Sequence, residues 1–478
     1  MLFSCIKTKA QDKKLSLVDV IELAKNQSPD AKIASTIKEQ EYWFNQRFKS
    51  NYNPSLDLQG EVPGYNRSFI VNQQDNGELE YQSREQITSN LGLSLNQRIT
   101  ATGGRISINS SMDQFKNLNT DFERFNNTLF NVRIFQPLFG FNDLKWDKKT
   151  EPLRYEGSKR AFVEKMESIS ADATDKYFVY LTAQVQLQIA QFNLANNDTI
   201  YNIEQGRYNI GTASRSDILQ VELQLLTSQQ RVTQASLDMK TSKQELASFI
   251  GISLETNSAL ELLPPQELPD FNISLEKAMI YARENRSDFI NFERRKLIAS
   301  REVVRAKSER FQTYLTGSFG LNRAAPTLGE SYNDLNNQQR VNVSINVPIV
   351  DWGRSKSSLK IALAQQQLEQ YLLEQELQNF EQQISTLVST FEVLRLQVEI
   401  TKKSDEVAKE RYDVAQNQYL NGKTKITDLN IALNEKDQAK GSYISSLRQF
   451  WISYFDLRRL TLYDFLNNEL LYQKEGGG

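Results

Sequence analysis

The 478-residue sequence has no histidine and a single cysteine, Cys5. Histidine is the side chain that most often acts as a general base or binds a transition metal, so its absence argues against both kinds of site. One cysteine can form neither a disulfide within the chain nor a cysteine-based metal site. No segment has the glycine-rich pattern of a phosphate-binding loop. We therefore expect no catalytic residues, no metal site, no cofactor and no enzymatic activity.

The sequence also has few glycines and prolines, a small net charge and no long apolar run. Only 20 glycines and 10 prolines occur, which favours long regular elements over many turns. The net charge of −2 creates no strong field, so we expect no nucleic-acid partner. The mean hydropathy is −0.55, and no apolar run reaches the length of about 18 residues that a transmembrane helix needs. A membrane role would depend on strands, whose alternating pattern is a weaker signal.

The two ends of the sequence look like remnants of processing or tagging. Residues 1–11 resemble the tail of a secretory signal, because Thr8-Lys9-Ala10 precedes Gln11 as in a small-x-small cleavage site. Lipid attachment at Cys5 and an uninformative N-terminus are the alternatives. Cleavage would leave the mature chain without cysteine, which suits an oxidising periplasm. The last three residues of the tail 466–478 are glycines and resemble a tag remnant.

The sequence contains two copies of one pattern. Three residues, Tyr208, Gly211 and Asp217, recur 211 positions later as Tyr419, Gly422 and Asp428. Pro137 and Pro348 have the same offset, whereas Ser16-Leu17 recurs 258 positions later as Ser274-Leu275. The first copy therefore holds 47 extra residues before Pro137, either as additional strands or as a loop. We divide the chain into copies at residues 12–262 and 270–465, joined by a linker at 263–269.

Each copy contains a long helix with a seven-residue repeat. Steps of four and three residues from Phe162 to Tyr208 meet mostly apolar side chains, and the same register runs from Leu373 to Tyr419. Such a repeat predicts helices of about 60 residues that supercoil against neighbours. Apolar residues beside this stripe suit neighbours on two sides, as in a closed ring of helices. The Tyr-x-x-Gly segments end both helices, and we expect Ser216-Asp217 and Thr427-Asp428 to cap the return helices.

An alternating pattern precedes each of the two prolines. The alternating apolar residues are Phe130, Val132 and Ile134 in the first copy and Val341, Val343 and Ile345 in the second. This alternation fits strands between lipid and a wet lumen, and it fits a soluble antiparallel sheet equally well. In the first copy, Thr102-Gly103-Gly104 between two further alternating runs is a hairpin signal. We expect residues 323–335 to form a loop between strands.

The duplicated order of helix, strands, long helix, Tyr-x-x-Gly turn and return helix resembles the TolC-like outer membrane efflux proteins. The segments 137–141 (PLFGF) and 348–353 (PIVDWG) are similar to the strand-to-helix junctions of that family. The likeness covers about residues 14–465. Two shorter segments, 53–56 (NPSL) and 146–149 (WDKK), resemble the branch of the family found in Bacteroidetes.

The resemblance implies a mixed α/β membrane protein that forms a homotrimer. Two strands per copy from each of three chains would build an outer-membrane β-barrel of twelve strands or more, continued by a coiled-coil barrel of helices in the periplasm. The implied partners are outer-membrane lipid, a periplasmic adaptor (membrane fusion) protein and an inner-membrane RND or ABC transporter. The duct would be passive, would serve efflux or type I secretion, and would open at its periplasmic tip, with the cargo unspecified.

The resemblance also implies where function resides. A constriction at the tip would use Asp428 and Glu435, although the family's second acidic position holds Ile431 here. The remaining site residues are Tyr208, Gly211, Asp217, Tyr419 and Gly422 in the tip turns and Pro137 and Pro348 at the strand-to-helix junctions. The plain alternative is that the aspartates cap helices and the turn residues only pack. Salt bridges among Arg207, Glu204 and Arg411 would hold the tip closed.

A periplasmic coiled-coil scaffold or an adaptor protein is the competing interpretation. An adaptor would have one helical hairpin between small β domains, whereas this sequence has two full copies in tandem. A scaffold would not need the alternating strands before each proline. The sequence therefore favours the exit duct.

Overall fold

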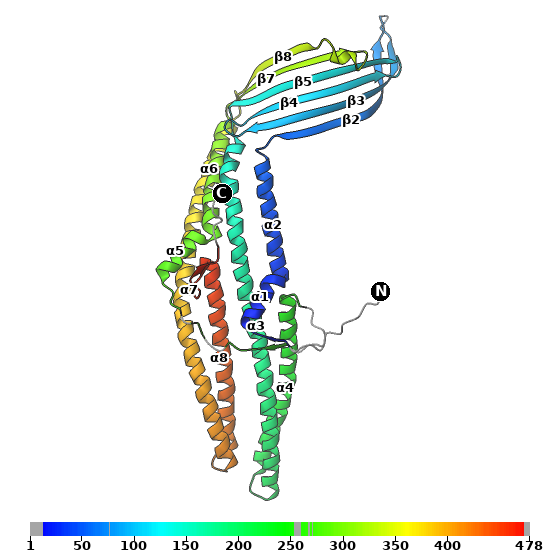
Figure 1. Cartoon of the computed structure of the whole chain (residues 1–478). Helices are drawn as coiled ribbons and strands as arrows, with labels where there is room; N and C mark the ends of the chain where they lie inside the picture. Colours follow the sequence, from blue (N-terminus) through cyan, green and yellow to red (C-terminus); the bar gives the residue numbers. More distant parts are fainter. Residues whose placement is uncertain (1–12, 76, 253–259, 266–267, 270, 473–478) are drawn as a thin grey trace. The chain divides into compact units, whose positions relative to one another are not determined.

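The computed structural model describes residues 13–75, 77–252, 260–265, 268–269 and 271–472. The suggested signal remnant at 1–11 and the C-terminal glycines lie outside these residues. The chain divides into two compact units. Figure 1 labels the helices and strands of both. The first unit comprises residues 1–40, 157–289 and 376–478, and the second comprises residues 41–156 and 290–375.

The helices of the two copies match in length. The first copy has α1 (Leu17–Gln27), α2 (Pro29–Ser50), α3 (Asp143–Asn209) and α4 (Arg215–Phe249), and the second has α5 (Leu275–Asn285), α6 (Ser287–Ser308), α7 (Arg354–Leu420) and α8 (Ile426–Thr461). Helices α1 and α5 have 11 residues each, α2 and α6 have 22, and α3 and α7 have 67. Helix α5 begins 258 residues after α1, and α7 begins 211 residues after α3, as the sequence offsets predict.

A break divides the helix that was expected at the start of each copy. Ser28 and Arg286 have extended backbones, with ψ of 149° and 146°. In the first copy Pro29 follows the break, and a proline disfavours helical geometry in the residue before it. In the second copy the Ser287 amide donates to Glu164 Oε1 at 2.7 Å, which replaces the helical hydrogen bond. Each copy therefore begins with two helices.

Four helices of the first unit lie side by side in the order α4, α3, α8, α7 (Figure 1). Lys176 on α3 pairs with Glu245 on α4 at 2.9 Å. Arg448 on α8 pairs with Asp175 on α3 at 2.6 Å. Lys440 on α8 pairs with Asp405 on α7 at 3.0 Å. Helices α4 and α7 are therefore the two outer members of the set.

Large side chains from several elements form the core of the first unit. Its fully buried members include Tyr177, Phe178 and Tyr180 of α3, Leu246 of α4, Phe391 of α7 and Phe450 of α8. Strand β1 (Lys13–Leu15) pairs in parallel with β6 (Leu260–Leu262). The Tyr180 hydroxyl donates to the Leu260 carbonyl at 2.5 Å. The start of the described chain and the segment between the two copies are thereby held against α3.

A buried ion-pair network lies where α8 ends. Glu167 is 2% exposed and accepts from Arg458 Nε and from Lys25 Nζ, both at 2.7 Å. Arg458 also pairs with Asp464 at 2.6 Å, and Asp464 accepts the Tyr454 hydroxyl at 2.7 Å. Asp464 belongs to a short antiparallel pair, β9 (Tyr463–Asp464) with β10 (Glu469–Leu470). The network stabilises this end only while it is complete, because removing one member leaves a buried charge without a partner.

The second unit contains one antiparallel sheet of six strands in the order β2–β3–β4–β5–β7–β8. The strands are β2 (Ser55–Gln73), β3 (Leu79–Ile99), β4 (Gly104–Asn117), β5 (Phe122–Phe139), β7 (Gln312–Ala325) and β8 (Asn336–Asn346). The expected loop between the last two strands lies at residues 326–335 and contains the short 3₁₀ helix η1 (Glu330–Tyr332). Strands β2 and β8 each have one neighbour and form the edges of the sheet.

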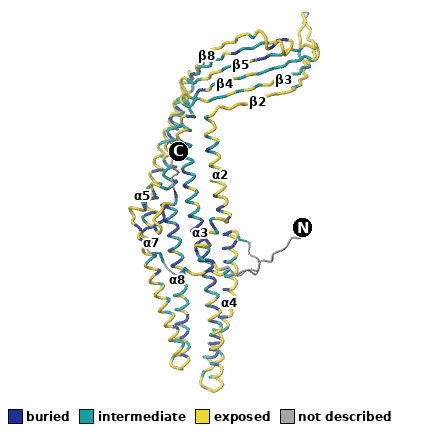
Figure 2. The backbone as a smooth tube through the Cα atoms, viewed as in Figure 1, coloured by how far each residue is buried: buried dark blue, intermediate teal, exposed yellow. Residues whose placement is uncertain are grey.

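The sheet has one apolar face and one polar face. Cross-strand pairing brings Leu58 beside Leu93, Ile108 beside Val132, and Leu315 beside Val343 on the apolar face. On the polar face it brings Asp57 beside Ser94, Ser107 beside Arg133, and Thr316 beside Asn342. Many apolar side chains of this face are exposed, and β8 is exposed along its whole length (Figure 2). The alternation expected before each proline is therefore present across the entire sheet.

The first copy supplies four strands rather than two. Strand β2 follows α2 as β7 follows α6, and β5 precedes α3 as β8 precedes α7. The hairpin β3–β4 has no counterpart in the second copy, so the 47 extra residues form two further strands of the same sheet. The sequence left open whether these residues form strands or a loop, because an inserted antiparallel hairpin leaves no change in the helices that flank it; the structure shows that they form strands.

Candidate functional site at the helical tip

Two turns end the long helices, one between α3 and α4 and one between α7 and α8. Gly211 has φ of +81° and Gly422 has φ of +67°, values that residues with a Cβ seldom adopt. The amide of the residue after each glycine donates a hydrogen bond to a carbonyl in the last turn of the preceding helix. Thr212 N–H donates to the Arg207 carbonyl and Lys423 N–H donates to the Gln418 carbonyl, both at 2.9 Å. These contacts satisfy carbonyls that the helix end would leave free.

Asp217 is the third residue of α4 and not its N-cap. The N-cap is Ser214, whose hydroxyl accepts from Asp217 N–H at 3.2 Å. The Asp217 carboxylate accepts in return from the Ser214 amide at 2.9 Å and from the Ser214 hydroxyl at 2.6 Å. This reciprocal capping box lowers the pKa of Asp217, chiefly through the side-chain hydrogen bond from Ser214. The expected cap at Ser216-Asp217 is wrong because Ser214 starts the helix two residues earlier.

Asp428 likewise lies in the first turn of α8, after the N-cap residue Lys425. Its carboxylate is exposed and accepts from Thr424 Oγ at 2.7 Å. A carboxylate in this position interacts favourably with the positive end of the helix dipole. Thr427-Asp428 is therefore not the cap, although Asp428 does stabilise the start of α8. The structure places an exposed carboxylate, hydrogen-bonded to Thr424, in the first turn of α8.

Glu435, the second expected constriction residue, lies two turns further along α8 and forms an ion pair with Arg411 of α7. Both side chains are about half exposed, so the pair contributes little to stability. Ile431 lies between Asp428 and Glu435 in the chain and is exposed. The exposed acidic group on this part of α8 is therefore Asp428, since an arginine neutralises Glu435.

Tyr419 links the two helical hairpins of the chain. Its side chain is 2% exposed, and its hydroxyl donates to Glu204 Oε1 of α3 at 2.6 Å. Arg207 donates to the same oxygen at 2.7 Å, and its guanidinium lies 5.5 Å from the centre of the Tyr419 ring. Burial and the hydrogen bond to Glu204 raise the pKa of Tyr419, so the phenol remains a donor at physiological pH. We name Glu204, Arg207 and Tyr419 the Tyr419 cluster.

The corresponding tyrosine of the first copy has a different environment. Tyr208 is 40% exposed, and no residue that the structure describes accepts a hydrogen bond from its hydroxyl. The two tyrosines occupy equivalent sequence positions, but only Tyr419 joins α7 to α3. The two equivalent tyrosines therefore differ in burial and in their contacts.

A second polar contact between the hairpins lies further from the turns. Asn196 of α3 donates to the Tyr412 hydroxyl at 3.0 Å. The Lys436 ammonium lies 4.2 Å from the centre of the Tyr412 ring and 4.7 Å from that of Phe192. Burial raises the pKa of Tyr412 to about 12 and lowers that of Lys436. Next to it, Asn193 donates to Asp437 at 2.7 Å, and burial raises the pKa of that carboxyl.

Sequence reasoning anticipated part of this arrangement. The expected salt bridge of Glu204 with Arg207 forms, and Arg411 pairs with Glu435. The contacts made by Asn193, Asn196 and Lys436 were missed. A signal for buried polar contacts was present, because Asn197 and Glu204 interrupt a stripe that is apolar at most of its other positions. Buried polar residues need partners, and Asn197 finds Ser228 of α4 at 2.6 Å.

The junction prolines lie at the ends of strands. Pro137 lies within β5, and Pro348 lies two residues beyond β8. In the second copy Asp351 accepts from the Gly353 amide at 3.0 Å and from the Ser355 amide at 2.9 Å. These hydrogen bonds stabilise the first turn of α7 after the irregular segment at 347–353. The prolines therefore mark where a strand is replaced by a helix.

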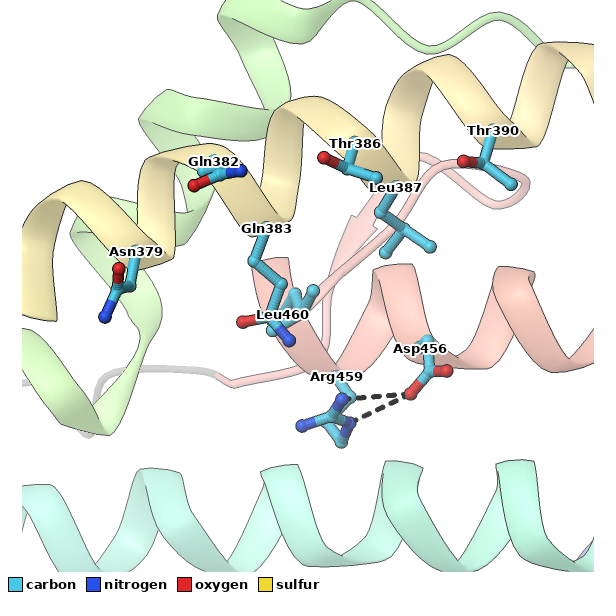
Figure 3. Close-up of a pocket in the computed structure, with 9 residues that line it drawn as sticks. All are labelled: Asn379, Gln382, Gln383, Thr386, Leu387, Thr390, Asp456, Arg459 and Leu460. Carbon is cyan, nitrogen blue, oxygen red and sulfur yellow. Dashed lines mark hydrogen bonds and ion pairs between the residues drawn. The ribbon is translucent and has the colours of Figure 1, made fainter.

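The surface of the α7–α8 pair carries an open groove of about 500 Å³, shown in Figure 3. Its lining is Asn379, Gln382, Gln383, Thr386, Leu387, Thr390, Asp456, Arg459 and Leu460. Arg459 is satisfied by Asp456 at 3.0 Å. Among the described residues no group of acidic, cysteine or histidine side chains is arranged to hold a metal ion. Seven of the nine lining side chains are polar or charged.

No helix of the described chain is both long enough and apolar enough to cross a membrane. A model of the outer membrane efflux protein family matches residues 94–252 and 282–461. Among curated proteins, none matches the sequence.

Solved structures with a similar fold include three bacterial outer membrane proteins. The CmeC outer membrane channel of Campylobacter jejuni has a TM-score of 0.67 and 16% identity, with 96% of this chain and 87% of that chain covered. The outer membrane protein VceC of Vibrio cholerae gives 0.62 and 13%, with 95% and 96% covered. The open state of the MtrE outer membrane channel of Neisseria gonorrhoeae gives 0.61 and 17%, with 93% and 88% covered. These likenesses show the fold.

The family match covers part of each copy, including the long helices, the tip turns and the return helices. It does not favour the alternative of a periplasmic scaffold or adaptor protein, and efflux proteins of this kind are conduits at the outer membrane. The chain belongs to the outer membrane efflux protein family and acts in efflux at the outer membrane.

Proposed function

We propose that three copies of the chain form a passive duct through the outer membrane, and that a periplasmic adaptor protein opens it at the helical tip. The observation that carries this proposal is a pair of unpartnered apolar stripes on α7 and α4, the two outer helices of the first unit. A helix with apolar faces on both sides needs neighbours on both sides. A ring of identical chains supplies them.

The stripe on α7 repeats every seven residues. Its members are Val393, Ile400, Val407 and Val414, and all are more than half exposed. Ile400 and Val407 also line an open groove of about 560 Å³ between α7 and α8. Exposed β-branched residues at this spacing are typical of a seam that another helix covers. The groove therefore fits a helix rather than a small molecule.

The stripe on α4 consists of Leu219, Leu223, Leu226 and Leu237, which are also exposed. Helix α7 runs toward its turn and α4 runs away from its own, so the two would meet as antiparallel neighbours. One register places three apolar pairs together, namely Val414 with Leu219, Val407 with Leu226, and Leu396 with Leu237. Because one stripe lies on each outer helix, the contact is head-to-tail and generates a ring.

The sheet of the second unit supports the membrane part of the proposal. Its uncovered apolar face suits lipid, and its opposite face, rich in Asn, Ser and Thr, suits a water-filled lumen. The tip supports the gating part. The Tyr419 cluster holds the two hairpins of a chain together, and an adaptor that binds the separated hairpins more tightly would open them. Asp428, repeated around a threefold axis, would favour cations.

Transport energy would come from an inner-membrane transporter of the RND or ABC class, because a passive duct supplies none. Cargo selection would then lie mainly in that transporter. Efflux is the activity of the family. Type I secretion would need the same property of the duct, namely a continuous polar lumen.

Disulfide cross-linking tests the ring. In a Cys5→Ser background, Val407→Cys with Leu226→Cys should give covalent trimers on mild oxidation. The control is Val393→Cys with Leu219→Cys, which uses the same stripes but places the thiols about 30 Å apart along the helices. Planar-bilayer recording tests the duct, and we expect a small, cation-preferring current from the closed trimer. Monomers on oxidation, or no current from correctly inserted protein, would contradict the proposal.

A further inference from the structure

The two edge strands of the sheet are exposed and lack a partner on their outer side within the described chain. Strand β2 is bonded only to β3, and β8 is bonded only to β7. Every residue of β8 is exposed. Open strand edges present unpaired amides and carbonyls, which natural proteins usually cover or protect with charges. Strand β8 carries one charged residue, Arg340, and is otherwise neutral.

The apolar face continues to both edges. Leu56 and Leu58 of β2 are on the same face as Val341, Val343 and Ile345 of β8, as the register through all six strands shows. All five are exposed. If this face meets lipid, an unpaired edge would lie in hydrocarbon, where each unsatisfied backbone group costs several kcal/mol. The edges must therefore be paired in the membrane.

The chain cannot pair its own edges, because the smallest membrane barrels have about eight strands and this sheet has six. Another copy can do so. With an even number of strands the edge strands run in opposite directions, so β2 of one copy meets β8 of the next as an antiparallel pair. The polar faces match as well, since Asp57 and Gln59 lie on the same face as Asn342 and Ser344.

The geometry of β2 limits where this strand can pair regularly with β8 of another copy, a contact that we call the joint. The segment Ser55–Glu61 pairs without interruption, and the register shifts between Glu61 and Gly64. Pro63, which has no amide to donate, lies inside this irregularity. The proline therefore lies outside Ser55–Glu61, the segment of β2 in which we expect regular pairing with the neighbouring copy. Strand β8, with 11 residues, is long enough to span a bilayer core when tilted.

We propose that β2 of each chain pairs with β8 of its neighbour, and that three chains close a barrel of eighteen strands. This inference rests on the proposed function, which supplies the three copies. Eighteen strands exceed the twelve implied by two strands per copy, because the β3–β4 hairpin adds two strands to each chain. Barrel diameter grows roughly linearly with strand number, so the lumen is about one and a half times as wide as that of twelve strands. Barrels of 16–18 strands leave an open aqueous channel.

Cysteine pairs across the joint test this inference. In the Cys5→Ser background, Gln59→Cys is combined in turn with Asn342→Cys, Ser344→Cys and Asn346→Cys, which sample three registers on the polar face. We expect at least one pair to give covalent trimers. The control is Gln59→Cys with Val343→Cys, whose side chains lie on opposite faces and should not link. The helical pair Val407→Cys with Leu226→Cys is oxidised in parallel.

The outcomes separate the two proposals. Trimers from the helical pair with no product from any of the three strand pairs would overturn the β2–β8 joint alone. No trimer from either kind of pair would overturn the proposed function as well. If the strand cysteine pairs give covalent products of at most two chains, or of four chains, the barrel does not have eighteen strands. Imaging the wild-type assembly by electron cryomicroscopy gives a check that needs no variant, and a barrel of any other strand count would contradict the inference.

Discussion

Replacing Tyr419 with phenylalanine should shift the tip toward its open state. The change removes a hydroxyl that donates to Glu204 at 2.6 Å inside a buried contact. A hydrogen bond to a charged group contributes about 1.5–3 kcal/mol. Arg207 would still donate to the same carboxylate, so Glu204 is not left without a partner and the lower end of the range applies. We expect about a tenfold shift per chain, since 1.36 kcal/mol corresponds to a factor of ten.

Single-channel recording of the purified trimer measures this shift as open probability. If the three chains open together, the effects multiply, and the variant should spend much more time in high-conductance states. Tyr208→Phe is the matched control, because it makes the same chemical change at the equivalent position of the first copy. The reasoning fails if intact Tyr419→Phe trimers gate like wild type, or if Tyr208→Phe has the same effect.

Three further changes test the packing that supports the tip. Gly422→Ala should destabilise the protein by about 1–2 kcal/mol, because alanine is strained at φ of +67°. The control Gly206→Ala, inside α3, should stabilise the protein by up to about 1 kcal/mol. Chemical denaturation measures both free energies of unfolding, and equal effects of the two variants would refute the turn geometry. Glu167→Gln should cost about 3–5 kcal/mol because it leaves buried cations under-paired, and a neutral result in the same assay would contradict the network. Burial raises the pKa of Asp437, so its ionised form is disfavoured and wild type gains stability as the pH falls from neutral toward the usual aspartate range. Asp437→Asn, which can exchange two amide hydrogen bonds with Asn193, should be about 1 kcal/mol more stable at pH 7 and lose this advantage at acidic pH, as thermal unfolding at both pH values would show.

The helical part of the fold could be predicted because its signals are local and repeated. The offsets of 211 and 258 residues located equivalent helices, and the Tyr-x-x-Gly segments located both turns. A seven-residue apolar repeat is a strong signal, since it recurs about every two turns along the whole helix. The helices proved slightly longer than expected, at 67 residues against about 60.

Other features depended on contacts that the sequence does not specify. The β3–β4 hairpin was recognisable as a turn, but its membership of the main sheet rests on pairing with β2 and β5. The helix caps were misplaced by two residues, because Ser214 and Ser216 are both good caps and only the turn geometry selects Ser214. The unequal roles of Tyr208 and Tyr419 arise from tertiary packing, which duplicated motifs cannot reveal.

The inserted hairpin has a consequence for how such sheets can change size. Because a hairpin adds two strands, β5 still runs in the direction that its counterpart β8 takes, and the chain re-enters the long helix at the same end of the sheet. A single added strand would deliver the chain to the opposite end and separate the strand from its helix. Width in this architecture can therefore grow only by pairs of strands within each subunit, while the helices keep their number and length.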